Sequence, residues 1–246
     1  MDRAGKMLKL VDIEFSANTE TGRKDILKGI NLEIGDGFTV VTGPNGGGKS
    51  SLAKVISGLY KPTAGRIYLN GRDVTDMSIT ERAEAGISYA FQQPVRFKGL
   101  TVKDLITISA GKDISVSEAC EYLSSVGLCA RDYIDREVNA SLSGGELKRI
   151  EIATVLARGT DFAVFDEPEA GIDLWSFHSL IKVFERMREK TSGAIMIISH
   201  QERILDIADR IVVISDGRVE REGTKAEVLP GLMYDRACPR LDGVNE

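Results

Sequence analysis

The sequence predicts an α/β fold with a mostly parallel, doubly wound sheet, and three observations support this prediction. Strand-like and helix-like segments alternate over most of the chain, as they do where helices cross over between parallel strands. A glycine-rich loop at residues 43–50 separates a β-rich run from a helical pattern. The 246 residues are enough for a substantial core. We therefore expect a single domain, residues 1–246, interrupted by a helical insertion.

The first part of the chain carries patterns typical of an antiparallel β subdomain. Residues 7–15 and 29–34 are expected to form strands on either side of a polar turn at residues 16–23. The run at residues 66–69 is followed by Asn70-Gly71, a dipeptide that favours the tight turn of a hairpin. These strands would lie beside the main sheet.

The rest of the chain divides into a helical segment and a return to the main sheet. Residues 101–140 carry helical patterns and no strand-like run, so we expect a helical subdomain over about residues 93–145. The core that carries the main sheet would then comprise residues 1–92 and 146–246. The elements expected after the insertion are a helix from about 146 to 158, a buried strand at 162–165, a helix at 175–190 and a strand at 194–198.

Composition and charge exclude several classes of protein. The net charge of −5 argues against a large nucleic-acid-binding surface, because proteins that bind the phosphate backbone usually carry a basic excess. The apolar run at residues 194–198 is far shorter than the roughly 20 residues that span a bilayer. No signal peptide is visible, and Cys120, Cys129 and Cys238 show no paired spacing. We expect a cytoplasmic protein that binds no nucleic acid and does not insert into the membrane.

Residues 43–50 fit the phosphate-binding pattern G-x-x-x-x-G-K-[ST]. A β-rich run at residues 38–42 precedes the loop and a helical pattern follows it, so a helix N-terminus would point at bound phosphates. Lys49 would reach the β- and γ-phosphates and the Ser50 hydroxyl would hold Mg²⁺. This setting argues against an ordinary glycine-rich turn. The residues expected to bind the nucleotide are Gly43, Pro44, Asn45, Gly46, Gly47, Gly48, Lys49, Ser50 and Ser51.

Two acids end the buried strand at residues 162–165. Asp166 is placed to hold Mg²⁺, and Glu167 to orient or deprotonate an attacking water. Two solvated carboxylates at a strand end are the alternative. The four apolar residues before the pair, together with the phosphate loop, favour a catalytic pair.

The segment Leu142-Ser143-Gly144-Gly145-Glu146 precedes the long helix. Ser143 and Glu146 fit a capping box, which is the purely structural explanation. Two glycines at a helix start cost roughly 1 kcal/mol each relative to alanine. They are expected if exposed backbone N–H groups receive an anion there.

Two further polar residues lie at the ends of sheet segments. His200 follows the strand at residues 194–198 and would contact a γ-phosphate or the attacking water, although a surface histidine is the simpler alternative. Gln92 stands between the first sheet segment and the helical insertion, where its amide would ligate Mg²⁺ and move with the insertion. Neither His200 nor Gln92 would indicate a site by itself, but the presence of the phosphate loop elsewhere in the chain supports both roles.

Taken in order, these motifs resemble those of the ATP-binding-cassette (ABC) ATPases over essentially the whole chain. The resemblance implies an ABC ATPase fold, ATP hydrolysis with Mg²⁺, and a dimer in which the signature of one copy closes over ATP on the other. It gives Leu142, Ser143, Gly144, Gly145 and Glu146 the role of the signature. It adds Asp173 as the D-loop acid and Phe15 as the aromatic that stacks on adenine.

Two branches of the family remain open. One is the ATPase subunit of a membrane transporter, whose partner is a permease. The other is SufC, the ATPase of the Suf-type iron–sulfur cluster assembly machinery, whose partner is a soluble scaffold of SufB/SufD type. Three segments are more similar to the second branch, and on them the assembly role is expected. They are Phe91-Gln92-Gln93-Pro94-Val95, Glu169-Ala170-Gly171-Ile172-Asp173 and Ser199-His200-Gln201-Glu202-Arg203-Ile204-Leu205.

Overall fold

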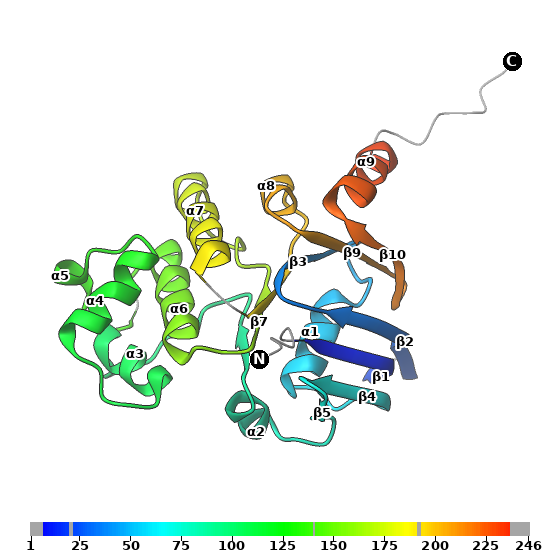
Figure 1. Ribbon diagram of the computed structural model, residues 1–246, viewed down its shortest axis with the longest axis horizontal. Coiled ribbons are helices and arrows are strands. Elements are labelled where there is room, and N and C mark those ends of the chain that lie inside the picture. The colour runs from blue at the N-terminus through cyan, green and yellow to red at the C-terminus, as the bar shows by residue number, and fades with distance from the viewer. Residues whose placement is uncertain (1–6, 20–21, 140, 191–192, 237–246) are drawn as a thin grey trace, which may run out of the picture.

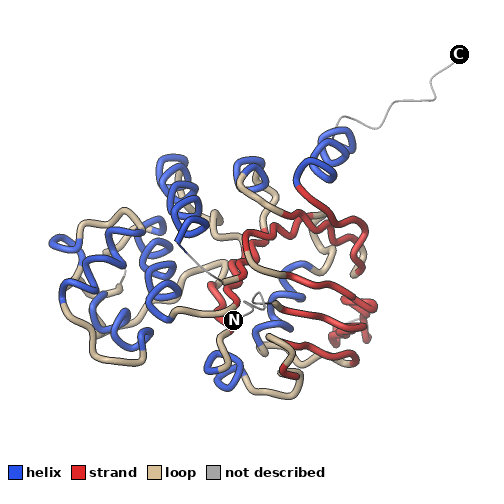
Figure 2. The backbone as a smooth tube through the Cα atoms, in the orientation of Figure 1, coloured by secondary structure: helices blue, strands red, loops and turns tan. Residues whose placement is uncertain are grey.

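The computed structural model describes residues 7–19, 22–139, 141–190 and 193–236 (Figure 1). Cys238 lies outside this part of the chain, and Cys120 and Cys129 are free thiols. Among the described residues, no helix is long and apolar enough to cross a membrane. The strands gather in one half of the molecule and a group of helices forms the other half (Figure 2).

A six-stranded sheet runs through the centre of the molecule in the order β10-β9-β3-β8-β7-β6. The five strands from β9 to β6 are parallel, and β10 pairs with β9 in the antiparallel sense. β7 and β8 are buried along their whole length, as expected for strands covered on both faces. The strands are β3 (Gly37–Thr42), β6 (Ile87–Ala90), β7 (Phe162–Asp166), β8 (Ala194–Ile198), β9 (Arg210–Ser215) and β10 (Arg218–Thr224).

A four-stranded antiparallel sheet lies beside the main sheet in the order β2-β1-β4-β5. Its strands are β1 (Leu8–Thr19), β2 (Gly22–Ile34), β4 (Ala64–Leu69) and β5 (Arg72–Asp73). The hairpin at Asn70-Gly71 is present, and both residues have positive φ. The expected polar turn at residues 16–23 is wrong, because β1 and β2 remain paired as far as Thr19 and Gly22. Ser16 bonds Asp25 across this ribbon, so polar residues here belong to exposed strands.

Nine helices lie in the described ranges, and four of them have complete capping boxes, including those begun by Ser78 and Ser143. Sequence reasoning did not predict β6, α8, β9, β10 or α9. The proposed division into core and helical subdomain places α3, α4 and α5 in the insertion. The helices are α1 (Lys49–Ser57), α2 (Ile79–Glu84), α3 (Val102–Ala110), α4 (Val116–Ser125), α5 (Ala130–Tyr133), α6 (Gly144–Arg158), α7 (Leu174–Lys190), α8 (Glu202–Asp206) and α9 (Lys225–Arg236).

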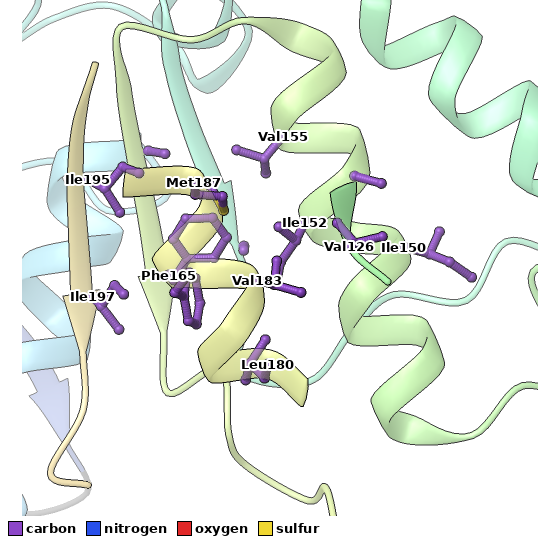
Figure 3. Packing of buried hydrophobic residues seen from close by; sticks show 14 of the residues in the cluster. Val126, Ile150, Ile152, Val155, Phe165, Leu180, Val183, Met187, Ile195 and Ile197 are labelled. Carbon is purple, nitrogen blue, oxygen red and sulfur yellow. The ribbon is translucent and has the colours of Figure 1, made fainter. Parts of the chain in front are cut away.

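The main sheet separates two hydrophobic clusters, because successive side chains of its strands point to opposite faces. Ala163 and Phe165 of β7 join the cluster formed with α6 and α7, where Leu180 and Met187 pack (Figure 3). Phe162 and Val164 join the other cluster, which includes the buried face of α1. The α/β architecture predicted from the sequence is thus present.

Arg82 of α2 is buried, with only 1% of its surface exposed, and it holds the C-terminal end of α1. Its guanidinium donates to the carbonyl oxygens of Val55, Ile56 (2.8 Å) and Thr75 (2.7 Å). The last carbonyls of a helix have no partner within the helix and carry partial negative charge, so a cation there is favourable. Burial lowers the pKa of Arg82, and the nearby acids Asp76 and Asp73 oppose that shift. Arg82 thus anchors the helix that begins at the phosphate-binding loop.

We expect Arg82→Met to lower the free energy of unfolding by about 2 to 4 kcal/mol, because it leaves buried carbonyls without donors. Urea denaturation measures this change. Arg72→Met is the control, since Arg72 is exposed on β5 and its loss should change stability by about 0.5 kcal/mol at most. Equal urea midpoints for the parent and Arg82→Met would show that Arg82 does not anchor α1.

Candidate nucleotide site

The loop at residues 43–50 connects β3 to α1, and its shape depends on two glycines at crowded positions. Gly43 has φ +131°, and a Cβ there would lie 2.1 Å from the carbonyl oxygen of Ile214. Gly48 is the N-cap of α1 with φ +106°, and its Cβ would lie 3.0 Å from a side-chain carbon of Leu27. A larger residue at either position would push the loop away from β9 or β2.

Lys49 is the first residue of α1, at the end of this loop, and only 5% of its surface is exposed. Its Nζ donates to the carbonyl oxygens of Gly43 (2.8 Å) and Pro44 (2.9 Å). Burial lowers the pKa of Lys49, and the nearby Glu167 and Asp166 charges oppose that shift. The ammonium group is therefore bound by the loop backbone and lies near Asp166 and Glu167, the two acids predicted from the sequence.

A cavity of about 430 Å³ opens in front of the loop. Six of the nine loop and helix residues expected to bind nucleotide line it, together with Glu167. The sequence did not identify the other walls, which come from β2 and the β9–β10 turn. Asp216-Gly217 is a turn signal, but nothing in the pattern places residues 24–26 beside the loop. The residues lining the cavity are Lys24, Asp25, Ile26, Asn45, Gly46, Gly48, Lys49, Ser50, Ser51, Glu167, Asp216 and Gly217.

Asp166 is almost fully buried at the end of β7, with 2% of its surface exposed. Its two oxygens accept hydrogen bonds from Ser50 Oγ (3.0 Å) and from the Tyr89 hydroxyl (2.9 Å). Burial raises the pKa of Tyr89, and the Asp166 charge raises it further, so the phenol stays a donor. A hydroxyl and a carboxylate side by side are the hard oxygen ligands that Mg²⁺ prefers, so these residues fit the ion.

Glu167 follows Asp166 and leaves the strand with φ +43°. Its backbone N–H donates to the carbonyl of Ile198 (3.0 Å), and its side chain reaches the cavity. Gln92 donates from Nε2 to Glu167 Oε2 at 2.5 Å. The structure therefore brings Gln92 to the expected general base, and its expected role as a Mg²⁺ ligand stays a prediction.

His200 lies directly after β8 and is exposed. It is close enough to Glu169 to oppose the raised pKa of that carboxyl, which is caused chiefly by burial. The hydroxyl of Ser199, the residue before His200, donates to Glu169, so the chain leaving β8 is held against the loop that follows β7. His200 is thus on the side of the site that carries the acids, and its contact with a γ-phosphate stays a prediction.

The signature segment lies outside the cavity just described. Ser143 and Glu146 form the expected capping box, with Ser143 N–H to Glu146 Oε2 at 2.7 Å. Leu142 is 2% exposed and packs in the core. A Cβ on Gly145 would lie 2.4 Å from Ser176 Oγ, so close packing against α7 also requires this glycine. Gly144 lies against the carbonyl of Gly171.

Two further expected residues are also absent from the cavity wall. Asp173 caps α7, accepting from Ser176 Oγ (2.6 Å) and the Trp175 N–H (2.9 Å), and bonding to Ser176 lowers its pKa. Phe15 stacks on Tyr60, with ring centroids 4.9 Å apart and planes at 12°. Its stacking on adenine stays a prediction, while Asp173 and the signature adjoin each other through Ser176.

Comparison with known proteins gives consistent matches. Residues 27–170 match the family described as ABC transporter. An uncharacterized ABC transporter ATP-binding protein of Methanocaldococcus jannaschii is 39% identical, over 94% of this chain and 94% of that protein. Vegetative protein 296 of Bacillus subtilis is 37% identical over 84% of each chain. A probable ATP-dependent transporter, ycf16, of Cyanidium caldarium is 33% identical over 81% of this chain and 84% of its own.

Solved structures agree with these matches. A dimeric ATP-binding cassette bound to ADP and phosphate superposes with a TM-score of 0.78 at 25% identity, covering 89% of this chain and 98% of that one. A nucleotide-free ATP-binding cassette from an ABC transporter also superposes with a TM-score of 0.78, at 26% identity, over 94% and 96% of the two chains. The fold prediction is confirmed.

Tyr89 is a residue that the motifs do not reveal, and its hydroxyl holds one oxygen of Asp166. Tyr89→Phe keeps the ring but removes one of the two hydrogen bonds that orient this carboxylate. We expect the Mg²⁺ concentration that half-saturates ATP hydrolysis to rise by about 3- to 10-fold, which corresponds to the net contribution of one hydrogen bond, about 1 kcal/mol. A Mg²⁺ titration of the ATPase rate measures this shift. Tyr68→Phe on β4 is the control, and identical titration curves for Tyr89→Phe and the parent would contradict the assignment.

Proposed function

Because this chain belongs to the ABC transporter family of ATP-binding proteins, we propose that it uses ATP hydrolysis to drive a conformational change in a partner protein. Family membership makes the chain an ATPase. One observation carries the proposal furthest. The phosphate loop, Ser50 with Asp166, and Gln92 with Glu167 all converge on one cavity edge.

The same contacts support a division of roles for hydrolysis. Lys49 would exchange its bonds to the Gly43 and Pro44 carbonyls for bonds to phosphate oxygens. Glu167 would accept a proton from a water aimed at the γ-phosphate. Ser50 and Asp166 would hold Mg²⁺, which supplies positive charge to the leaving phosphates. His200 would contact the γ-phosphate or the water from the end of β8.

We propose that two copies bind ATP between them. The signature and Asp173 do not line the cavity formed by their own loop, although they lie together beside Ser176. The first N–H groups of α6 have no acceptor inside the helix and would suit the anion bound by a second copy. The related cassette that holds ADP and phosphate is dimeric, which supports this arrangement.

The partner is a membrane permease or a soluble scaffold, and the two proposals rest on different observations. Two of the three relatives described above, those of Methanocaldococcus jannaschii and Cyanidium caldarium, are named as an ABC transporter ATP-binding protein and an ATP-dependent transporter, which favours the permease. The segments at residues 91–95, 169–173 and 199–205 favour an iron–sulfur assembly scaffold, by their similarity to the Suf branch. The permease proposal has the broader support, because it follows from the relatives over most of the chain.

Residues 93–98 form a surface on which either partner could dock. Val95 is 47% exposed and Phe97 is 41% exposed, so these apolar side chains are not absorbed by the chain's own helices. The backbone of Phe97 is fixed nevertheless, because its N–H donates to Val138 at 3.0 Å. An exposed apolar side chain on a fixed backbone, next to Gln92, suits a docking surface that senses the state of the site.

Dimerisation is tested in a Glu167→Gln background, which removes the proposed base and keeps the hydrogen-bonding shape. We expect turnover to fall by roughly 10²-fold while ATP still binds. With Mg-ATP this variant should then run as a dimer in size-exclusion chromatography. Adding Ser143→Arg should return it to a monomer, since a bulky cation would face Mg²⁺ across the interface. If Glu167→Gln stays monomeric with Mg-ATP both in the absence and in the presence of the partner, the shared site is contradicted.

The partner class is tested by affinity purification of the native chain and of Phe97→Asp. We expect Phe97→Asp to lose the partner and to keep ATP-dependent thermal stabilisation, because the nucleotide cavity is unchanged. Ile108→Asp is the matched control, since Ile108 is 64% exposed on α3 and should keep the partner. Recovery of an integral membrane protein supports the permease, and recovery of a soluble scaffold supports cluster assembly. Equal recovery with Phe97→Asp would exclude this surface.

A further inference from the structure

A buried ion pair on α6 holds the residue immediately before Gln92. Lys148 is 1% exposed and Glu151 is 15% exposed along its side chain, and the two bond at 2.8 Å. They are three residues apart, so they lie on one face of the helix. Lys148 Nζ also donates to the carbonyl of Phe91, and the Phe91 N–H donates to Glu151 at 2.9 Å. Both backbone groups of Phe91 are therefore bound by a single ion pair.

The position of Phe91 explains why such a clamp is needed there. β6 is an edge strand of the main sheet and pairs with β7 only as far as Ala90 and Phe165. Phe91 is the first residue beyond that pairing, so the sheet no longer fixes its backbone. The Phe91 ring meets Tyr89 edge to face, with centroids 4.9 Å apart, and about a third of it is exposed. The ion pair instead binds the backbone N–H and carbonyl that a neighbouring strand would bind in a sheet.

The cost of burying these charges argues for a purpose beyond stability. Burial raises the pKa of Glu151, and Lys148 opposes that shift. Replacing a buried ion pair by apolar residues of similar size is often neutral or stabilising. The pair makes one contact with the carbonyl of Phe91 and one with its N–H, and apolar side chains could make neither contact.

We propose that Lys148 and Glu151 are positioning residues, which couple the signature helix to Gln92 and thereby to Glu167. α6 begins at the signature residues Ser143, Gly144 and Gly145, and the clamp lies in the turns that follow. A shift of α6 therefore carries Phe91 with it. Gln92, one residue further, is bonded to Glu167. The inference rests on the proposed ATP-dependent function and deepens it.

The clamp is tested with the double variant Lys148→Met/Glu151→Leu, which keeps the volume and removes the polar contacts. Because the phosphate loop is untouched, KM for ATP should stay within about 2-fold while kcat falls by about 10-fold, as for a lost transition-state interaction. Hydrogen exchange should become faster in the peptide that contains Phe91 and Gln92, and should be unchanged in peptides from β7 and β8. Lys112→Gln/Glu118→Gln removes an exposed pair in the helical insertion and should leave both readouts unchanged.

Glu151→Gln separates positioning from simple packing, because its amide oxygen still accepts from the Phe91 N–H. We expect it to recover at least a third of the parent kcat, while Glu151→Leu does not. Equal kcat in the parent and the double variant would overturn the clamp alone, as would unchanged exchange near Phe91. A parent that binds Mg-ATP but hydrolyses none would instead overturn the proposed function.

Discussion

The parallel register of β3, β8, β7 and β6 is the constraint on which the rest of the site depends. Val41 and Asp166 both pair with Ile198, so these strands end at one level. The ladder continues one step further, since Ser199 N–H donates to Val41 and Glu167 N–H to Ile198. Loops that leave adjacent parallel strands at a common edge must converge, and ligands bind there in open α/β sheets. Residues more than a hundred positions apart thereby meet around one cavity.

The chemistry of the site was readable from the sequence because it resides in short motifs. The phosphate loop, Asp166 and Glu167 each follow a strand whose apolar pattern is clear, so parallel pairing alone brings them together. The error in the β subdomain arose where strand residues have the composition of a turn. Residues 16–19 and 22–23 are mostly polar, and their strand structure is visible only through the pairing of β1 with β2. Tyr89 acts through its contact with Asp166, and Lys148 through its contacts with Phe91 and Glu151, and no motif exists for these contacts.

The glycines illustrate how one residue can satisfy two demands. Sequence reasoning assigned Gly144 and Gly145 to anion binding, because glycine is costly at a helix start. The structure adds a steric reason, since a Cβ on Gly145 would collide with Ser176 of α7. Asp173 caps that same helix through Ser176. The close approach therefore ties Gly145 to Asp173 through Ser176, and in the proposed dimer the nucleotide of the second copy would meet both residues together.

The resting arrangement of the acids also bears on control of hydrolysis. Gln92 donates to one oxygen of Glu167 and so holds the carboxylate in one orientation, while its other oxygen can accept from a water. Lys49 is likewise engaged by two backbone carbonyls of its own loop. Phosphates can displace these loop contacts directly, because Lys49 lines the cavity. The Gln92 contact is different, since its segment is bound to α6 and continues into the exposed surface at residues 93–98. On the proposed mechanism, the base is therefore positioned from outside the cavity, and a partner that moves α6 or that surface would change the rate without touching ATP.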